Sequence, residues 1–227
     1  MKDIRITLTR WVACLTTLLF FAGVTLGGPP LLCERIEIGS EKSLPWSSSS
    51  WNITGEEKYD VNHLVSDTLA LLTPDAPVLA HMETLRRATI YAQHKPAIAK
   101  ELLAKLEART YEKPQDALAA FDFGYLSECY KQMSWLFQYA DSLKATPEHR
   151  VGFDAAKNVD GYGWVKKAIH LSGQNAEMEF AAALIATDGI KGERQEHVQM
   201  ARAGAKDNPM LARNLEKRFP NKTALAR

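Results

Sequence analysis

The sequence predicts an all-α fold, preceded by an N-terminal hydrophobic signal or anchor helix. From Val61 onward, apolar residues recur at the i, i+3, i+4 and i+7 positions of a helix that buries one face. Prolines stand where helices can begin, and strand signals are scarce after residue 40. These observations favour either an antiparallel helical bundle or a short stack of helix-turn-helix hairpins.

A hydrophobic segment opens the chain. Three basic side chains within the first ten residues precede an uncharged run, residues 11–28, which Pro29 follows. As a helix this run would be about 27 Å long, at about 1.5 Å per residue, which is the lower limit for crossing a bilayer. We therefore expect residues 1–28 to be a secretory signal or a retained membrane anchor, and both alternatives stay open. In either case the remainder is expected to be extracytoplasmic, for example periplasmic.

Composition divides the remainder into three parts. Residues 29–59 are predicted to form a linker, because a run of four serines lies there between Trp46 and Trp51. The two tryptophans are expected to dock onto the following domain. That helical domain is predicted over residues 60–220, and a flexible tail over residues 221–227.

The helical pattern is interrupted at several points. Prolines 74 and 77 separate the first two helical segments, and Pro96 begins a third. The longest apolar region, residues 114–143, is expected to be the central helix, with Gly124 allowing another helix to approach closely. A polar stretch, residues 144–160, is predicted to be a surface loop. The predicted helical segments are residues 61–72, 78–91, 96–106 and 114–143, with the pattern resuming at Tyr162.

A weak internal repeat has a displacement of about 33 residues, which is typical of helical hairpin repeats. The segment Trp164–Ala168, with Asn175, Met178 and Ala182, aligns with Val198, Ala201, Asn208, Leu211 and Leu215. A third segment, residues 88–102, matches residues 201–215. Each of the three segments is interpreted as a helix, a tight turn and a second helix.

The Trp164 segment, with Lys167, Gly173 and the Phe180–Leu184 run, resembles the Sel1-like and tetratricopeptide families. Gly189 and Gly192, before the next helix, are similar to the Sel1-like turn. The resemblance covers about residues 160–218 and extends to residues 83–106. It implies a protein-binding scaffold without catalytic residues.

The charge balance gives no nucleic-acid signature. The whole chain has a formal net charge of +1. Removing residues 1–28 removes three basic side chains and one acidic one, which leaves −1. Such a body has no electrostatic attraction to phosphate backbones, so no nucleic-acid partner is expected.

Catalytic and metal-binding patterns are sparse. No two of the six histidines stand at i, i+3 or i, i+4, and the chain has no C-x-x-C motif, so neither a metal nor a cofactor is expected. Glycan hydrolysis would need a carboxylic acid in an apolar cleft. Glu128, among aromatic neighbours, is the candidate acid, and Asp122 the candidate assistant on roughly the same side of the helix.

Two groups of residues are candidates for binding. Arg86 and Arg87 lie beside Glu83 and could bind an acidic group of a partner, or pair with Glu83 on the same helix. Four aromatic residues could form a small-ligand pocket, and these are Phe121, Tyr125, Trp135 and Trp164.

Two cysteines follow the leader, Cys33 and Cys129. In an oxidising compartment they could form a disulfide or remain separate thiols.

The sequence therefore predicts an exported or membrane-anchored helical protein-interaction domain, whose partner is a protein of unknown identity. Two alternatives remain. One is a small-ligand binding protein with the aromatic pocket, and the other is an envelope hydrolase that uses Glu128.

Overall fold

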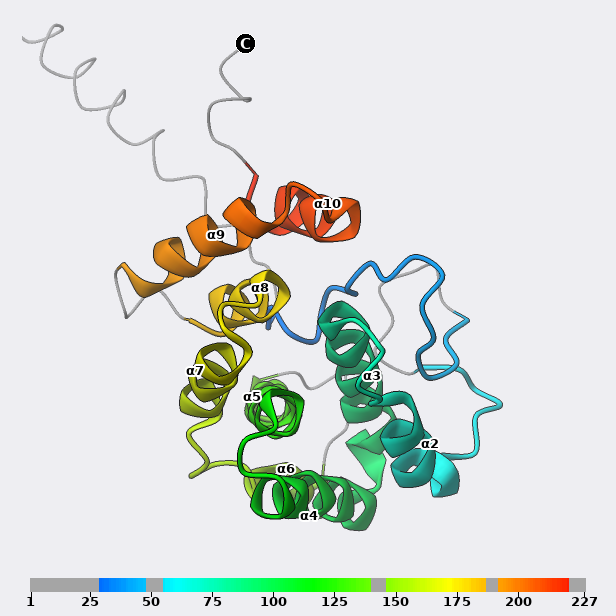
Figure 1. The fold of residues 1–227 in the computed structure, drawn as a ribbon. Coiled ribbons are helices and arrows are strands. Elements are labelled where there is room, and N and C mark those ends of the chain that lie inside the picture. Colours follow the sequence, from blue (N-terminus) through cyan, green and yellow to red (C-terminus); the bar gives the residue numbers. More distant parts are fainter. Residues whose placement is uncertain (1–28, 48–54, 140–145, 187–191, 221–227) are drawn as a thin grey trace, which may run out of the picture.

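The computed structural model describes residues 29–47, 55–139, 146–186 and 192–220. Within these ranges the protein is all-helical, without a strand, which confirms the all-α part of the predicted fold (Figure 1). No helix in the described ranges is both long enough and apolar enough to cross a membrane, and the predicted leader lies outside them. The α-helices are α2 (Leu64–Leu71), α3 (Val78–Tyr91), α4 (Pro96–Glu112), α5 (Ala117–Tyr139), α6 (Pro147–Asp154), α7 (Gly161–Ser172), α8 (Ala176–Ile185), α9 (Glu193–Gly204) and α10 (Pro209–Arg218), and two short 3-10 helices are η1 (Val61–His63) and η2 (Ala92–His94).

Helix α5 occupies the centre of the molecule, where the longest apolar region of the sequence predicted it. It contacts α3, α4, α6 and α7, and Figure 1 shows these helices around it. A Cβ atom at Gly124 would lie 2.7 Å from the carbonyl oxygen of Gly161 and 2.8 Å from Cβ of Trp164. The absent side chain of Gly124 therefore sets how closely α5 and α7 approach, as the sequence suggested.

The predicted surface loop at residues 144–160 contains a helix, α6, in its described part. Pro147 occupies the first turn of this helix, and the side chain of His149 accepts the backbone N–H of Thr146. Gly152 allows α6 to lie on α4, because a Cβ there would come within 2.7 Å of Cα of Pro96. The loop prediction was wrong here because it took Pro147 and Gly152 as loop signals, whereas the proline lies in the first turn of a helix and the glycine at a helix contact.

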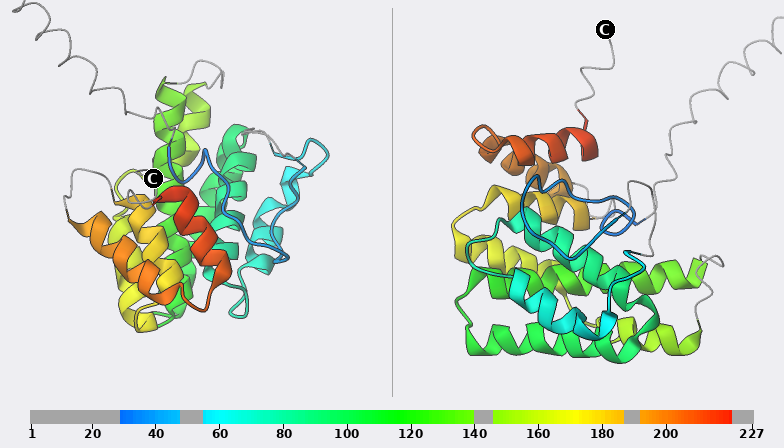
Figure 2. Two further views of the ribbon diagram at one scale, coloured as in Figure 1. Left: turned by 90° about the horizontal axis from the view of Figure 1, so that it is seen from above. Right: turned by 90° about the vertical axis from the view of Figure 1, so that its right-hand side faces the viewer.

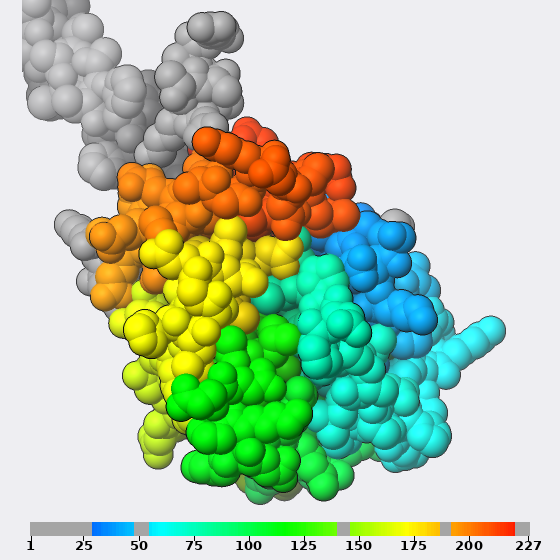
Figure 3. All heavy atoms as spheres, viewed as in Figure 1, coloured from blue at the N-terminus to red at the C-terminus, as the bar shows by residue number. Residues whose placement is uncertain are grey.

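Residues 29–47, named the N-terminal segment, lie against the helices. The side chains of Leu31, Leu32 and Leu44 have no exposed surface, and Ile36 has almost none. The space-filling view shows the segment seated between α10 and α3 (Figure 3). Over these residues the linker prediction does not hold, because the segment contributes to the hydrophobic core. The predicted docking of Trp46 agrees with the structure, whereas Trp51 lies outside the described residues.

Side chains of α10 and α5 bind the backbone of the N-terminal segment. Asn214 accepts the N–H of Glu37 at 2.9 Å and donates to its carbonyl at 2.8 Å. Gln132 accepts the N–H of Leu31 at 2.8 Å. Arg218 donates to the carbonyl of Pro30 and pairs with the carboxylate of Glu34. Consequently, most of these contacts recognise the main chain, whose polar groups need partners once they are buried.

Candidate functional site

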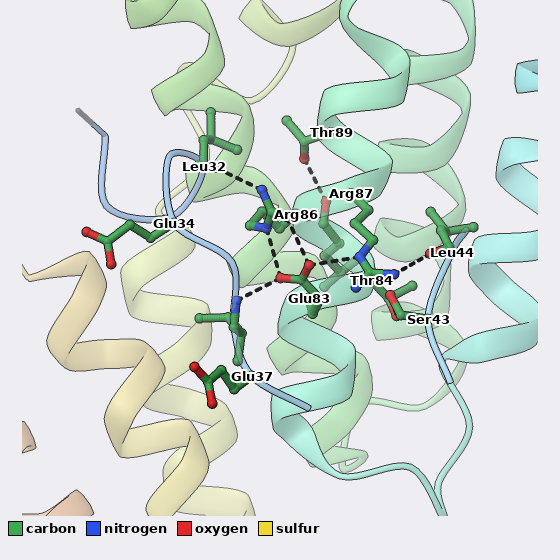
Figure 4. Close-up of polar contacts among 12 residues, drawn as sticks. Leu32, Glu34, Glu37, Ser43, Leu44, Glu83, Thr84, Arg86, Arg87 and Thr89 are labelled. Atoms are coloured by element: carbon green, nitrogen blue, oxygen red, sulfur yellow. Dashed lines mark hydrogen bonds and ion pairs between the residues drawn. The ribbon is translucent and has the colours of Figure 1, made fainter. Parts of the chain in front are cut away.

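Glu83, on α3, is the centre of a buried charged cluster (Figure 4). Its side chain has no exposed surface. One carboxylate oxygen accepts Nε of Arg86 and the backbone N–H of Ile36, both at 2.8 Å. The other oxygen accepts Nη2 of Arg86 at 2.9 Å and Nε of Arg87 at 2.8 Å. Four donors therefore surround one carboxylate, an arrangement that compensates for its removal from water.

Both arginines also reach the N-terminal segment. Arg86 donates to the carbonyl of Leu32 at 2.9 Å, and Arg87 donates to the carbonyl of Leu44. The guanidinium groups lie 4.9 Å and 5.7 Å from the ring centroid of Trp46, within cation–π range. Of the two predicted alternatives, the structure shows pairing with Glu83 on the same helix, and the remaining donors of both arginines bind backbone carbonyls of their own chain.

Asp122 forms a second buried cluster, with His81. Its Oδ1 lies 2.7 Å from Nδ1 of His81, and Nε2 of His81 lies 3.0 Å from the carbonyl oxygen of Thr73. Both atoms that face the ring are acceptors, so both ring nitrogens must carry a proton to form these bonds. Burial lowers the pKa of His81, but the charge of Asp122 and the hydrogen bonds to Asp122 and Thr73 together outweigh it and raise the pKa above its ordinary value. Arg109 lies 3.6 Å from the second oxygen of Asp122.

Glu128 does not contact the His81–Asp122 cluster, and its partners are Lys131 and the start of α7. Its Oε1 accepts Nζ of Lys131 at 2.8 Å and the backbone N–H of Tyr162, in the first turn of α7, at 3.1 Å. The carboxylate thus satisfies an amide at a helix N-terminus, where negative charge is favourable. Asp122 and Glu128 therefore do not share a site. Six residues along a helix rotate the side chain to about 120° from its starting direction, so the prediction that both lie on one side was wrong.

The four aromatic residues of the predicted pocket do not gather. Phe121 and Tyr125 stack in the core, with ring centroids 5.5 Å apart. Trp164, on α7, packs edge-on against Phe123 at 5.3 Å. Trp135 is half exposed near the C-terminal end of α5. The first two side chains face inward and Trp135 faces solvent, so the predicted small-ligand pocket is not formed by these residues.

A polar cluster that the sequence analysis missed joins α7, α8 and α9. The hydroxyl of Tyr162 donates to Glu193 at 2.6 Å and lies 2.7 Å from Nε2 of His197. Nδ1 of His197 lies 2.5 Å from Glu179. Burial and the hydrogen bond to Glu193 raise the pKa of Tyr162, which keeps the phenol a proton donor. The arrangement suits a cross-link between helices, and short-range spacing could not reveal it because its hydrogen-bonded pairs join residues 18 to 35 positions apart.

The two cysteines do not form a bridge in this structure. Cys33 is half-buried, Cys129 is buried, and both are free thiols. Burial raises the pKa of each thiol, which disfavours the reactive thiolate.

The charged clusters share one property, because each joins parts of its own chain within an all-helical domain. Within the described ranges, no three His, Cys, Asp or Glu side chains gather as they would to hold a metal ion. No family model, no curated protein and no solved structure matches this chain.

Proposed function

We propose that this protein is a helical protein-interaction domain that acts outside the cytoplasm, delivered by residues 1–28 as a cleaved signal or a retained anchor. The proposal takes the four C-terminal helices as two consecutive hairpin repeats, α7–α8 and α9–α10. Proteins built from stacked helical hairpins present extended surfaces to their partners.

The observation that carries the proposal is the equivalence of residues 33 positions apart. Asn175 begins α8 by accepting the amide of Met178, and Asn208 begins α10 by accepting the amide of Leu211. Both are N-caps. The matched apolar positions are buried in both hairpins, and the pairs are Val165 with Val198, Ala168 with Ala201, Met178 with Leu211, and Ala182 with Leu215. One hairpin pattern used twice supports a stack over an irregular bundle.

The arrangement of the helices supports the same proposal. In the side view, α7, α8 and α10 lie in successive layers above α4 and α6 (Figure 2). The contacts follow this order, since α8 packs on α7 and on α9, and α9 packs on α10. The carboxylates of Asp122 and Glu128 are engaged by His81 and by the start of α7, which favours binding over turnover by these two acids.

Photo-crosslinking in cells that produce the full chain tests the binding role. A photoreactive amino acid would replace exposed residues on different helices, such as Lys105 on α4 and Met200 on α9. We expect discrete crosslinked products from a subset of positions. An absence of products from every surface position would contradict the proposal.

Export is tested separately with Met200→Cys. With Cys14 changed to Ser, the two remaining native thiols are half-buried or buried, so labelling by a membrane-impermeant maleimide reports mainly on position 200. We expect labelling in intact cells. Labelling that requires lysis would show that the domain faces the cytoplasm.

A further inference from the structure

We propose that the hollow beside Trp135 binds an acidic segment of a protein partner. The hollow has a volume of about 340 Å³ and lies between the C-terminal half of α5 and α6. Its lining includes Trp135, Phe153, Lys131, Arg150, Asp154 and Lys157. This inference rests on the proposed interaction function and assigns a surface and a partner chemistry to it.

An exposed aromatic pair marks one side of the hollow. Trp135 is 50% exposed, and Tyr139, one helical turn further along α5, is 63% exposed. Their ring centroids are 4.9 Å apart with the planes tilted by 42°. Figure 2 shows the end of α5 projecting with α6 from the body of the molecule. Partially exposed Trp and Tyr side chains are typical anchors of protein–protein interfaces.

The charges of the lining select the partner. Arg150 and Lys157 are exposed, and among the described residues neither has an acidic partner within 4 Å. Lys131 is paired with Glu128, and the carboxylate of Asp154 accepts the hydroxyl of Ser134 at 2.6 Å. With Asp154 counted, the lining outside the Lys131–Glu128 pair carries a net charge of +1, and its two unpaired cations lie beside an indole. An acidic segment would complement them, and Trp, Tyr and Arg together are the residues enriched in protein interfaces.

The base of the hollow is rigid. Phe153 has no exposed surface and packs edge-on against Tyr130 and Phe137, at centroid distances of 4.8 and 5.6 Å. The side chains that would contact the partner are exposed, so substitutions there are expected to leave the fold intact. An apolar residue within the acidic segment would pack on Trp135 while its carboxylates reach Arg150 and Lys157.

A titration with the full chain in detergent tests the partner chemistry. The probe is a fluorescent peptide of eight residues, in which pairs of Asp and Glu alternate with Leu. We expect saturable binding that weakens at least tenfold with Trp135→Ala and with Lys157→Glu, and weakens again when salt is raised. Circular dichroism checks that both variants remain folded.

Two control variants are matched to these changes. Tyr111 is a 72% exposed aromatic residue at the far end of α4, and Lys105 is an exposed lysine on the same helix. Tyr111→Ala and Lys105→Glu are expected to leave binding unchanged. Equal effects from the controls, no saturable binding, equal binding of the matched Asn/Gln peptide, or preference for an oligouronate over the peptide would each overturn the proposal.

Crosslinking from Gln138, which lines the hollow, separates this proposal from the broader one. We expect a photoreactive residue at position 138 to capture a partner at an acidic segment, and Lys157→Glu to abolish the product. Crosslinked products from position 200 but none from position 138 would overturn the proposal that the hollow binds a partner and would leave the broader interaction function unaffected. No products from any position would overturn both.

Discussion

At the scale of single residues, a charge in the core is retained only where enough donors or acceptors surround it. Glu83 has four donors, and two of its partners continue to the backbone of the N-terminal segment. The residue thus compensates buried charge and holds a distant part of the chain at the same time. Breaking such a pair by removing one partner is far more harmful than its net contribution suggests.

Glu83→Gln is therefore expected to lower the free energy of unfolding by about 3–5 kcal/mol, because Arg86 would keep its buried charge without a counter-charge. Urea unfolding followed by circular dichroism measures this. Glu41→Gln, a change at an exposed residue of the N-terminal segment, is the control and is expected to change stability by less than about 0.5 kcal/mol. A loss below about 1 kcal/mol for Glu83→Gln would contradict the role assigned to the cluster.

His81 makes stability depend on pH. Its pKa is raised in the folded protein above the value of about 6.5 expected when unfolded. Because folding favours the protonated form, its contribution is fully present below about pH 6.5 and is lost as the pH rises through the raised pKa.

The unfolding free energy of the native chain is expected to exceed that of His81→Gln most at low pH, and the gap is expected to shrink as the pH rises. Chemical unfolding between pH 5.5 and 9 measures the gap. His94, whose pKa is lowered by burial and by His149, acts in the opposite direction, but it is common to both proteins and so is expected to cancel. A gap that does not change with pH would argue against the doubly protonated ring.

At the scale of elements, the close contact between α5 and α7 depends on a residue without a side chain. The backbone carbonyl of Gly161 and the Cβ of Trp164 occupy the space beside Gly124. The two helices cannot keep this distance if a methyl group lies between them. Glu128 strengthens the same contact by accepting the amide of Tyr162.

The sign of the stability change caused by Gly124→Ala tests this packing. Alanine is the better helix former by about 1 kcal/mol, so the substitution would stabilise an isolated α5. Here we expect a net loss of about 1–3 kcal/mol, because α7 must move away. Thermal unfolding measures the effect, and an increase in the melting temperature would contradict the packing described for Gly124.

At the scale of the whole molecule, the N-terminal segment is part of the folded body. It covers the Glu83 cluster, and its buried leucines join the main core. The helical body and residues 29–47 therefore depend on each other for folding. If residues 1–28 are an anchor, no spacer separates them from the packed chain.

Two truncated chains test this dependence. A chain that begins at residue 29 is expected to unfold cooperatively, like the full chain. A chain that begins at residue 48 is expected to lose cooperative unfolding, because each buried leucine contributes about 1.5–3 kcal/mol and the Glu83 cluster loses its cover. Circular dichroism melting curves distinguish them. Equal melting temperatures would show that the segment is a dispensable linker.

Sequence reasoning succeeded where the signal is local. The helical class follows from periodicity, the start of α4 from Pro96, and the contact of α5 with another helix from Gly124. These features depend on backbone sterics and on neighbours within a few turns. The predicted helix over residues 78–91 has the same bounds as α3 for this reason.

Only the tertiary structure decided the distant partners of the charged residues and the place of the N-terminal segment. His81 and Asp122 are 41 residues apart, and Arg86 lies 54 residues from Leu32, so no spacing rule connects them. The N-terminal segment contains no helix or strand, so its buried leucines do not recur at a regular spacing. Hydrophobic periodicity can be detected in consecutive residues of the sequence. Burial and pairing between distant charged residues arise only when distant segments share one core.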